Sequence, residues 1–87
     1  MINFKQQELS EMLFDKLKIK FPELDLIDIT ESPENPNHVL VNIIIPDDDD
    51  KEIAIRKRAG KISTDILMKY GYLIMISTAV REEQSAA

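Results

Sequence analysis

Hydrophobic and polar residues follow two different periods along the chain, and the changes of period predict five elements. In the N-terminal part, apolar side chains recur every three or four positions, as they do on an amphipathic helix. The stripe consists of Leu9, Met12, Leu13, Leu17 and Phe21. We expect Phe14 and Ile19 to widen it enough for the helix to lie on a sheet. Asn3 and Gln6 have the spacing of a capping box, and Pro22 ends the helix.

Two strands are predicted next. In Leu24–Thr30 the apolar residues fall on both parities, which indicates a β-bulge or a strand with two apolar sides. The stretch ESPENPN is rich in proline and asparagine and predicts a loop, so the two strands should form an antiparallel hairpin. In His38–Ile45 the alternation is regular, and Pro46 ends the strand. One side of this second strand carries Val39, Val41, Ile43 and Ile45.

A second helix is predicted from about Lys51 to Tyr70. Its apolar stripe consists of Ile55, Ala59, Ile62, Ile66 and Tyr70, with Leu67 beside it. Because the stripe continues past Gly60, we expect one helix; the alternative is a break at Gly60 with Ser63 capping a second segment. Gly71 is the expected residue after the helix end.

The last strand, Tyr72–Val80, is apolar on both parities. This pattern predicts a strand covered on both faces, in the middle of the sheet or against a partner chain. The order α-β-β-α-β predicts a single small α+β domain over residues 1–80, with two helices packed on a three-stranded mixed sheet and a polar C-terminal tail at 81–87. Both the last strand and the small size favour a homo-oligomer.

Composition narrows the function. The net charge of −5 and the pI of about 4.7 disfavour RNA as a ligand, because a phosphate backbone is repelled by an acidic protein. There is no cysteine, which excludes disulfides and thiolate metal sites. Apolar runs are too short to cross a membrane, and the N-terminus lacks a signal pattern, so we expect a cytoplasmic protein without membrane contact.

Residues for catalysis or metal binding are scarce. We interpret Asp47–Asp50 as a solvated turn and helix cap, with Asp49 and Glu52 as an acidic capping box, rather than as a cation site. His38 is the only histidine, and no base is visible beside a nucleophile. Gly60 and Gly71 are the only glycines, which excludes a glycine-rich phosphate loop. We therefore expect no metal, no cofactor and no enzyme activity.

One basic cluster stands out, formed by Arg56, Lys57, Arg58 and Lys61. Helical geometry places Lys57 and Lys61 opposite the apolar stripe. One interpretation is a solvated helix face paired with nearby acidic residues; the other is a phosphate-binding patch, which makes these four residues the candidate nucleic-acid site. We expect no exposed aromatic side chain beside them on which a base could stack.

From Val39 onward, about half of the chain resembles the C-terminal half of small nucleotidyltransferase domains of the DNA polymerase β-like superfamily. The likeness rests on VLVNIII before an acidic turn, and on KYGYLIMIS with the trailing REE. The family's Gly-Ser and Asp-x-Asp signature, whose aspartates hold two metal ions, is absent from ITESPENPNHVLVN, and YLIMIST offers no third carboxylate. The resemblance thus implies a non-catalytic interaction module that acts through protein–protein contacts.

The stretch LDLIDITESPENPNHVLVNI, in the order α-β-β-α-β, also looks like ribosome-binding factor A, which has a KH-type RNA-binding fold. This likeness implies RNA or ribosome binding. The family's Ala-x-Gly kink would correspond to Ala59-Gly60, which lacks the intervening residue. A third possibility is nucleotidyl transfer in which Asp47–Asp50 replaces the lost aspartates.

Overall fold

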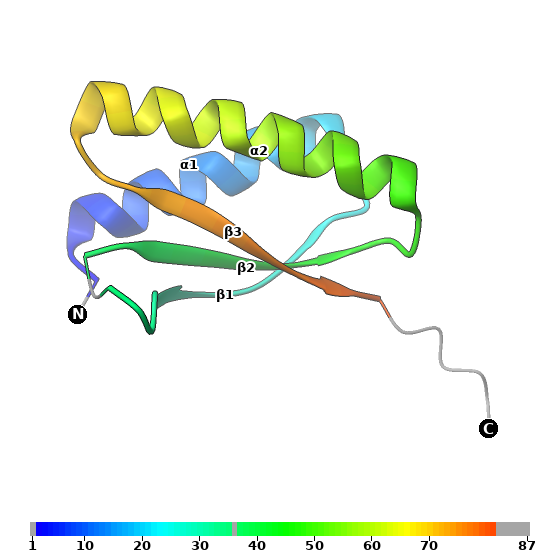
Figure 1. Cartoon of the computed structure of the whole chain (residues 1–87), viewed down its shortest axis with the longest axis horizontal. Coiled ribbons are helices and arrows are strands. Elements are labelled where there is room, and N and C mark those ends of the chain that lie inside the picture. Colours follow the sequence, from blue (N-terminus) through cyan, green and yellow to red (C-terminus); the bar gives the residue numbers. More distant parts are fainter. Residues whose placement is uncertain (1, 36, 82–87) are drawn as a thin grey trace.

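Five elements follow one another along the chain in the predicted order (Figure 1). They are α1 (Phe4–Lys20), β1 (Asp25–Glu31), β2 (Val39–Ile45), α2 (Asp49–Tyr70) and β3 (Ile74–Val80). The computed structural model describes residues 2–35 and 37–81. Most of the predicted polar tail, residues 82–87, therefore lies outside the described residues.

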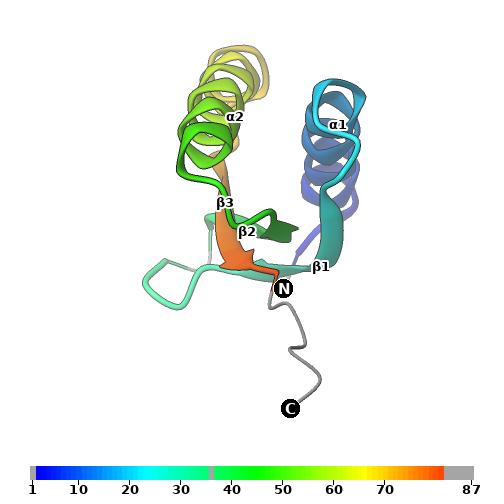
Figure 2. The same cartoon turned by 90° about the vertical axis from the view of Figure 1, so that its right-hand side faces the viewer.

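The three strands form one mixed sheet in the order β1-β2-β3. β1 runs antiparallel to β2, while β3 runs parallel to β2 because the long helix α2 returns the chain to the other end of the sheet. The register of β1 shifts between Leu26 and Asp28, which confirms the predicted bulge. Both helices lie on the same face of the sheet, α2 beside α1 (Figure 2). The predicted α+β class and its mixed sheet are confirmed.

The position of the last strand corrects one prediction. β2, not β3, is the central strand, and β3 forms an edge. Only one face of β3 is covered, so Ser77 and Ala79 are exposed on the other side. The pattern of apolar residues at both odd and even positions suggested a central strand. Two of these residues, Tyr72 and Leu73, lie before the strand begins.

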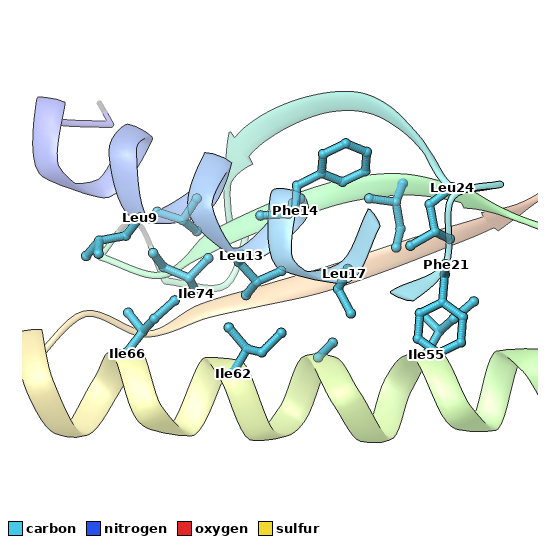
Figure 3. Packing of buried hydrophobic residues seen from close by; sticks show 14 of the residues in the cluster. Leu9, Leu13, Phe14, Leu17, Phe21, Leu24, Ile55, Ile62, Ile66 and Ile74 are labelled. Carbon is cyan, nitrogen blue, oxygen red and sulfur yellow. The ribbon is translucent and has the colours of Figure 1, made fainter. Parts of the chain in front are cut away.

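The core lies between the helices and the covered face of the sheet (Figure 3). Leu13 and Leu17 of α1 are fully buried, and the regular alternation of β2 is confirmed by four buried side chains at every second position. Ile19, predicted to widen the stripe of α1, is instead 83% exposed. It follows Leu17 by two residues, or about 200° around the helix, and so faces away from the sheet. Phe14, the other predicted addition, is buried.

The ends of α1 form as the sequence predicts. The Asn3 side chain accepts a hydrogen bond from the backbone N–H of Gln6 at 2.7 Å, and the Gln6 side chain accepts one from the N–H of Asn3 at 2.9 Å. This is the predicted capping box. Gln6 also donates to the backbone carbonyl of Asn37 at 3.3 Å, so the cap holds the β1–β2 loop against α1.

The second helix is continuous through Gly60, as expected, and the alternative prediction of a break at that residue is wrong. Gly71 ends the helix in the left-handed conformation, with φ of 77°, as expected. The N-cap, however, is Asp48 rather than Asp49, and its carboxylate accepts a hydrogen bond from the N–H of Lys51 at 3.1 Å. The helix therefore begins one residue earlier than the capping-box pattern predicted.

Candidate functional site

Among the described residues, no strand lies beside the outer edge of β3, so backbone groups at this edge have no strand partner. The N–H of Val39 donates to the carbonyl of Leu73 at 3.2 Å, and the N–H of Arg81 donates to that of Ile45 at 2.9 Å. Along a strand in a parallel pair, every second residue directs its backbone N–H and C=O groups toward the partner strand. In β3 these are the odd-numbered residues, which bond to β2. The N–H and C=O groups of Ile76, Thr78 and Val80 consequently point outward, away from the sheet.

The two edges of the sheet differ in chemistry. β1 carries the bulge and three carboxylates, on Asp25, Asp28 and Glu31, and both features discourage pairing with another strand. β3 contains no charged residue and no proline, and all of its residues pair with β2 in an unbroken register. Of the two edges, β3 is thus the one suited to receive a further strand.

A hollow of about 170 Å³ lies between α2 and β3. The side of α2 that faces it carries Arg56, Gly60 and Ser63. The Ser63 hydroxyl donates to the carbonyl of Ile74, and Arg56 donates to the Thr78 hydroxyl at 2.8 Å. A Cβ added at Gly60 would meet nothing within 4 Å. Open space thus remains beside the edge strand at the middle of α2.

The four predicted basic residues separate onto two sides of α2. Arg56 lies beside β3 and forms an ion pair with Glu52 at 3.0 Å, as the solvated-face interpretation requires. Lys57, Arg58 and Lys61 instead line a hollow of about 270 Å³ that opens toward the end of α1. Phe21 and Ala54 complete its lining together with Lys20. We call this the basic hollow.

The four cations of the basic hollow share one property. None of Lys20, Lys57, Arg58 and Lys61 forms an ion pair with any carboxylate of residues 2–35 or 37–81. The sequence alone did not point to Lys20, because it belongs to another helix and only the packing of α1 against α2 brings it to the cluster. In the sequence, only its position in the last turn of α1 could have indicated that Lys20 lies near the start of another element.

A third hollow, of about 380 Å³, lies farther along the two helices. Its lining includes Lys16 and Lys69, one acid, Asp65, and the ring of Tyr70. Tyr70 is 43% exposed, and the ammonium group of Lys5 lies 4.8 Å from its ring centre. Tyr70 lines this hollow and not the basic hollow, whose aromatic lining residue, Phe21, is buried, so the expectation that no exposed aromatic side chain lies beside the four predicted basic residues is not contradicted.

The described residues contain no group of three His, Asp or Glu side chains placed to hold a metal ion. In the run Asp47–Asp50, the carboxylate of Asp48 serves as the helix cap. His38 lies at the end of the β1–β2 loop, where its ring is 3.4 Å from the side-chain nitrogen of Asn35. The backbone N–H of His38 also donates to the carbonyl of Asn35, so both residues hold the loop in shape.

Comparisons of the chain with protein-family models, with curated proteins and with solved structures give no match. The likenesses to nucleotidyltransferase domains and to ribosome-binding factor A therefore stay predictions. Within the part of the chain that the structure describes, neither helix is long and apolar enough to span a bilayer.

Proposed function

We propose that the protein is a non-catalytic interaction module that binds a second copy of itself through β3. One observation carries this proposal: β3 is a regular, uncharged edge strand, whereas the opposite edge, β1, is bulged and acidic. Folded proteins usually protect their sheet edges, so an unprotected edge indicates a surface that pairs with another strand. The resemblance to nucleotidyltransferase domains without their metal-binding signature supports the same function.

The partner we infer is a second copy, related by a two-fold axis. An antiparallel pair of β3 strands would exchange hydrogen bonds through the outward groups of Ile76, Thr78 and Val80. Identical strands meet in such a pair, and because β3 is uncharged, no like charges would face each other. The open space at Gly60 would let the two α2 helices approach each other above the joined sheet.

The size of the chain also favours self-association. A domain of 87 residues buries only about 60–65% of the surface that its unfolded chain exposes, which leaves a small stability margin. Pairing through β3 would bury further apolar surface, including Val80, which is exposed. Self-association would then contribute stability as well as form the interface.

The test is the solution mass of the Thr78→Pro variant, measured by light scattering. Proline removes the outward N–H of Thr78 but none of the bonds from β3 to β2, so the chain should stay folded. We expect twice the chain mass of 10.0 kDa for the wild type and a single chain for the variant. Thr78→Val is the matched control, because it removes the hydroxyl that Arg56 contacts but keeps the N–H.

A second variant guards against misfolding. Val80→Lys places a charge on the exposed edge without touching the backbone, and we expect it to be monomeric with the circular dichroism of the wild type. A wild-type protein that is monomeric at its highest soluble concentration would refute the proposal. So would a Thr78→Pro variant that is folded and still dimeric.

The alternative function, that of a KH-like RNA- or ribosome-binding protein, draws on a different observation. The basic hollow gathers four cations that form no ion pair with a carboxylate of the described residues, in an otherwise acidic chain. It lies on the side of α2 away from β3, so the two functions do not compete for the same surface.

A further inference from the structure

We propose that the basic hollow is a binding site for adjacent phosphate groups, carried by a small polyphosphate or by a nucleic-acid strand. This inference goes beyond self-association and does not depend on it. It narrows the alternative function to recognition of phosphate charge at a site formed by both helices. The site residues are Lys57, Arg58 and Lys61 on α2 and Lys20 at the end of α1.

Like charges are concentrated in the basic hollow. Lys57 and Lys61 are one helical turn apart, and like charges at this spacing repel each other. The chain has more acidic than basic residues, yet no described carboxylate pairs with any of the four cations. A bound polyanion would remove the repulsion within the cluster.

The size and lining of the hollow determine the ligand class. Its volume of about 270 Å³ is below the roughly 300–1,000 Å³ of typical ligand pockets, so it suits an anionic group rather than a whole cofactor. The Phe21 ring is only 8% exposed and offers no face on which a base could stack. The Arg58 guanidinium can bind two oxygens of one phosphate, and the three lysines act as point charges. Recognition by charge rather than by base is what these groups provide.

The overall acidity of the protein does not prevent this binding. Three carboxylates of β1 belong to the sheet layer, whereas the basic hollow lies in the helix layer. At physiological salt, interactions between exposed charges are screened beyond about 8 Å. Four cations line the hollow and lie within this distance of an anion bound there, although the net charge of −5 would slow the approach of a long polyanion.

The test is a binding titration at low salt with three probes: inorganic tripolyphosphate, a short oligouridylate and a glutamate peptide of equal charge. We expect tripolyphosphate, the oligouridylate or both to bind, and the peptide to bind at least about tenfold more weakly, because Arg58 and the lysines favour phosphate oxygens. Binding of tripolyphosphate alone would identify a small polyphosphate as the source, and binding of the oligouridylate would identify a strand. Equal binding of the peptide would overturn the proposal in favour of an acidic protein partner.

The decisive variant is Lys20→Gln. Lys20 belongs to α1. If phosphate bound only to the basic run on α2, replacing Lys20 would not change the affinity; if phosphate binds in the hollow, the replacement would weaken binding. We expect Lys20→Gln and Lys61→Gln each to weaken binding about tenfold and to lower the slope of log affinity against log salt by about 0.7–0.9. Lys51→Gln is the matched control, since Lys51 is on α2 but outside the hollow, paired with Glu23 at 3.0 Å. An equal loss in the control, or no binding of either phosphate probe at low salt, would overturn the proposal.

Discussion

A single arginine beyond the end of β3 links the two edges of the sheet. The Arg81 backbone N–H donates to the carbonyl of Ile45 on β2, and its guanidinium forms an ion pair with Asp25, the first residue of β1. The hydrogen bond from Arg81 to Asp25 is the main reason that the pKa of the Asp25 carboxyl lies below its usual value of 3.8. The charge of Lys18, 3.9 Å away, acts in the same direction. Arg81 thus takes part in the fold although composition places it in the tail.

The Arg81→Gln substitution should raise the pKa of Asp25 toward 3.8. Because the folded-state pKa is lowered, the pair stabilises the fold above pH 3.8 and loses its effect as the pH falls through the lower, folded-state pKa. Carboxyl carbon shifts of Asp25 in an NMR pH titration measure this directly. Arg56→Gln is the control and should leave Asp25 unchanged. An identical Asp25 titration in Arg81→Gln and wild type would contradict the assignment.

The four consecutive aspartates at the start of α2 have different roles. Within Asp47–Asp50, Asp48 is the N-cap: its backbone is extended, and its carboxylate accepts a hydrogen bond from the N–H of Lys51. Asp49 and Asp50 already belong to the first turn of the helix, where their negative charges interact favourably with the positive end of the helix dipole. The sequence could predict that the run caps a helix, but not which carboxylate does so, because that depends on where the backbone turns after Pro46.

Asp48→Ala should lower the free energy of unfolding by about 1 kcal/mol, because the cap is lost. Asp48→Asn should change it much less, since asparagine is an equally good cap and both variants remove the same charge. Urea denaturation of the two variants side by side measures the difference. If the two variants were equally stable, the cap would not contribute and the charge alone would matter.

For the whole molecule, the sequence determined more of the interior than of the surface. The stripe of α2 and the alternation of β2 were predictable because burial on one side imposes a fixed period on each element. The edge position of β3 was not, since a strand that is apolar on both parities fits the middle or the edge of a sheet equally well. Nor was the basic hollow, because Lys20 and Lys61 meet only through the packing of two helices.

The core is small, so shortening one buried side chain should lower the stability of the whole domain. Leu17→Ala removes a fully buried side chain and should lower the free energy of unfolding by about 2–5 kcal/mol, a large part of the margin of a domain this size. Ile19→Ala, on the same helix but at an exposed position, should change it by less than about 0.5 kcal/mol. Thermal and urea unfolding distinguish the two, and similar losses would place Ile19 in the core after all.

The two sides of α2 have a consequence for the assembly. The face beside β3 would lie near the two-fold axis of the proposed dimer, and the basic hollow lies on the side away from it. A dimer of this kind is bivalent, with two identical anion sites held at a fixed separation. Once one site is occupied, the second meets the same polyanion at a high effective concentration, so a weak site on each chain becomes a strong one on the pair. Avidity, rather than the affinity of a single hollow, would then decide which polyanions the protein retains.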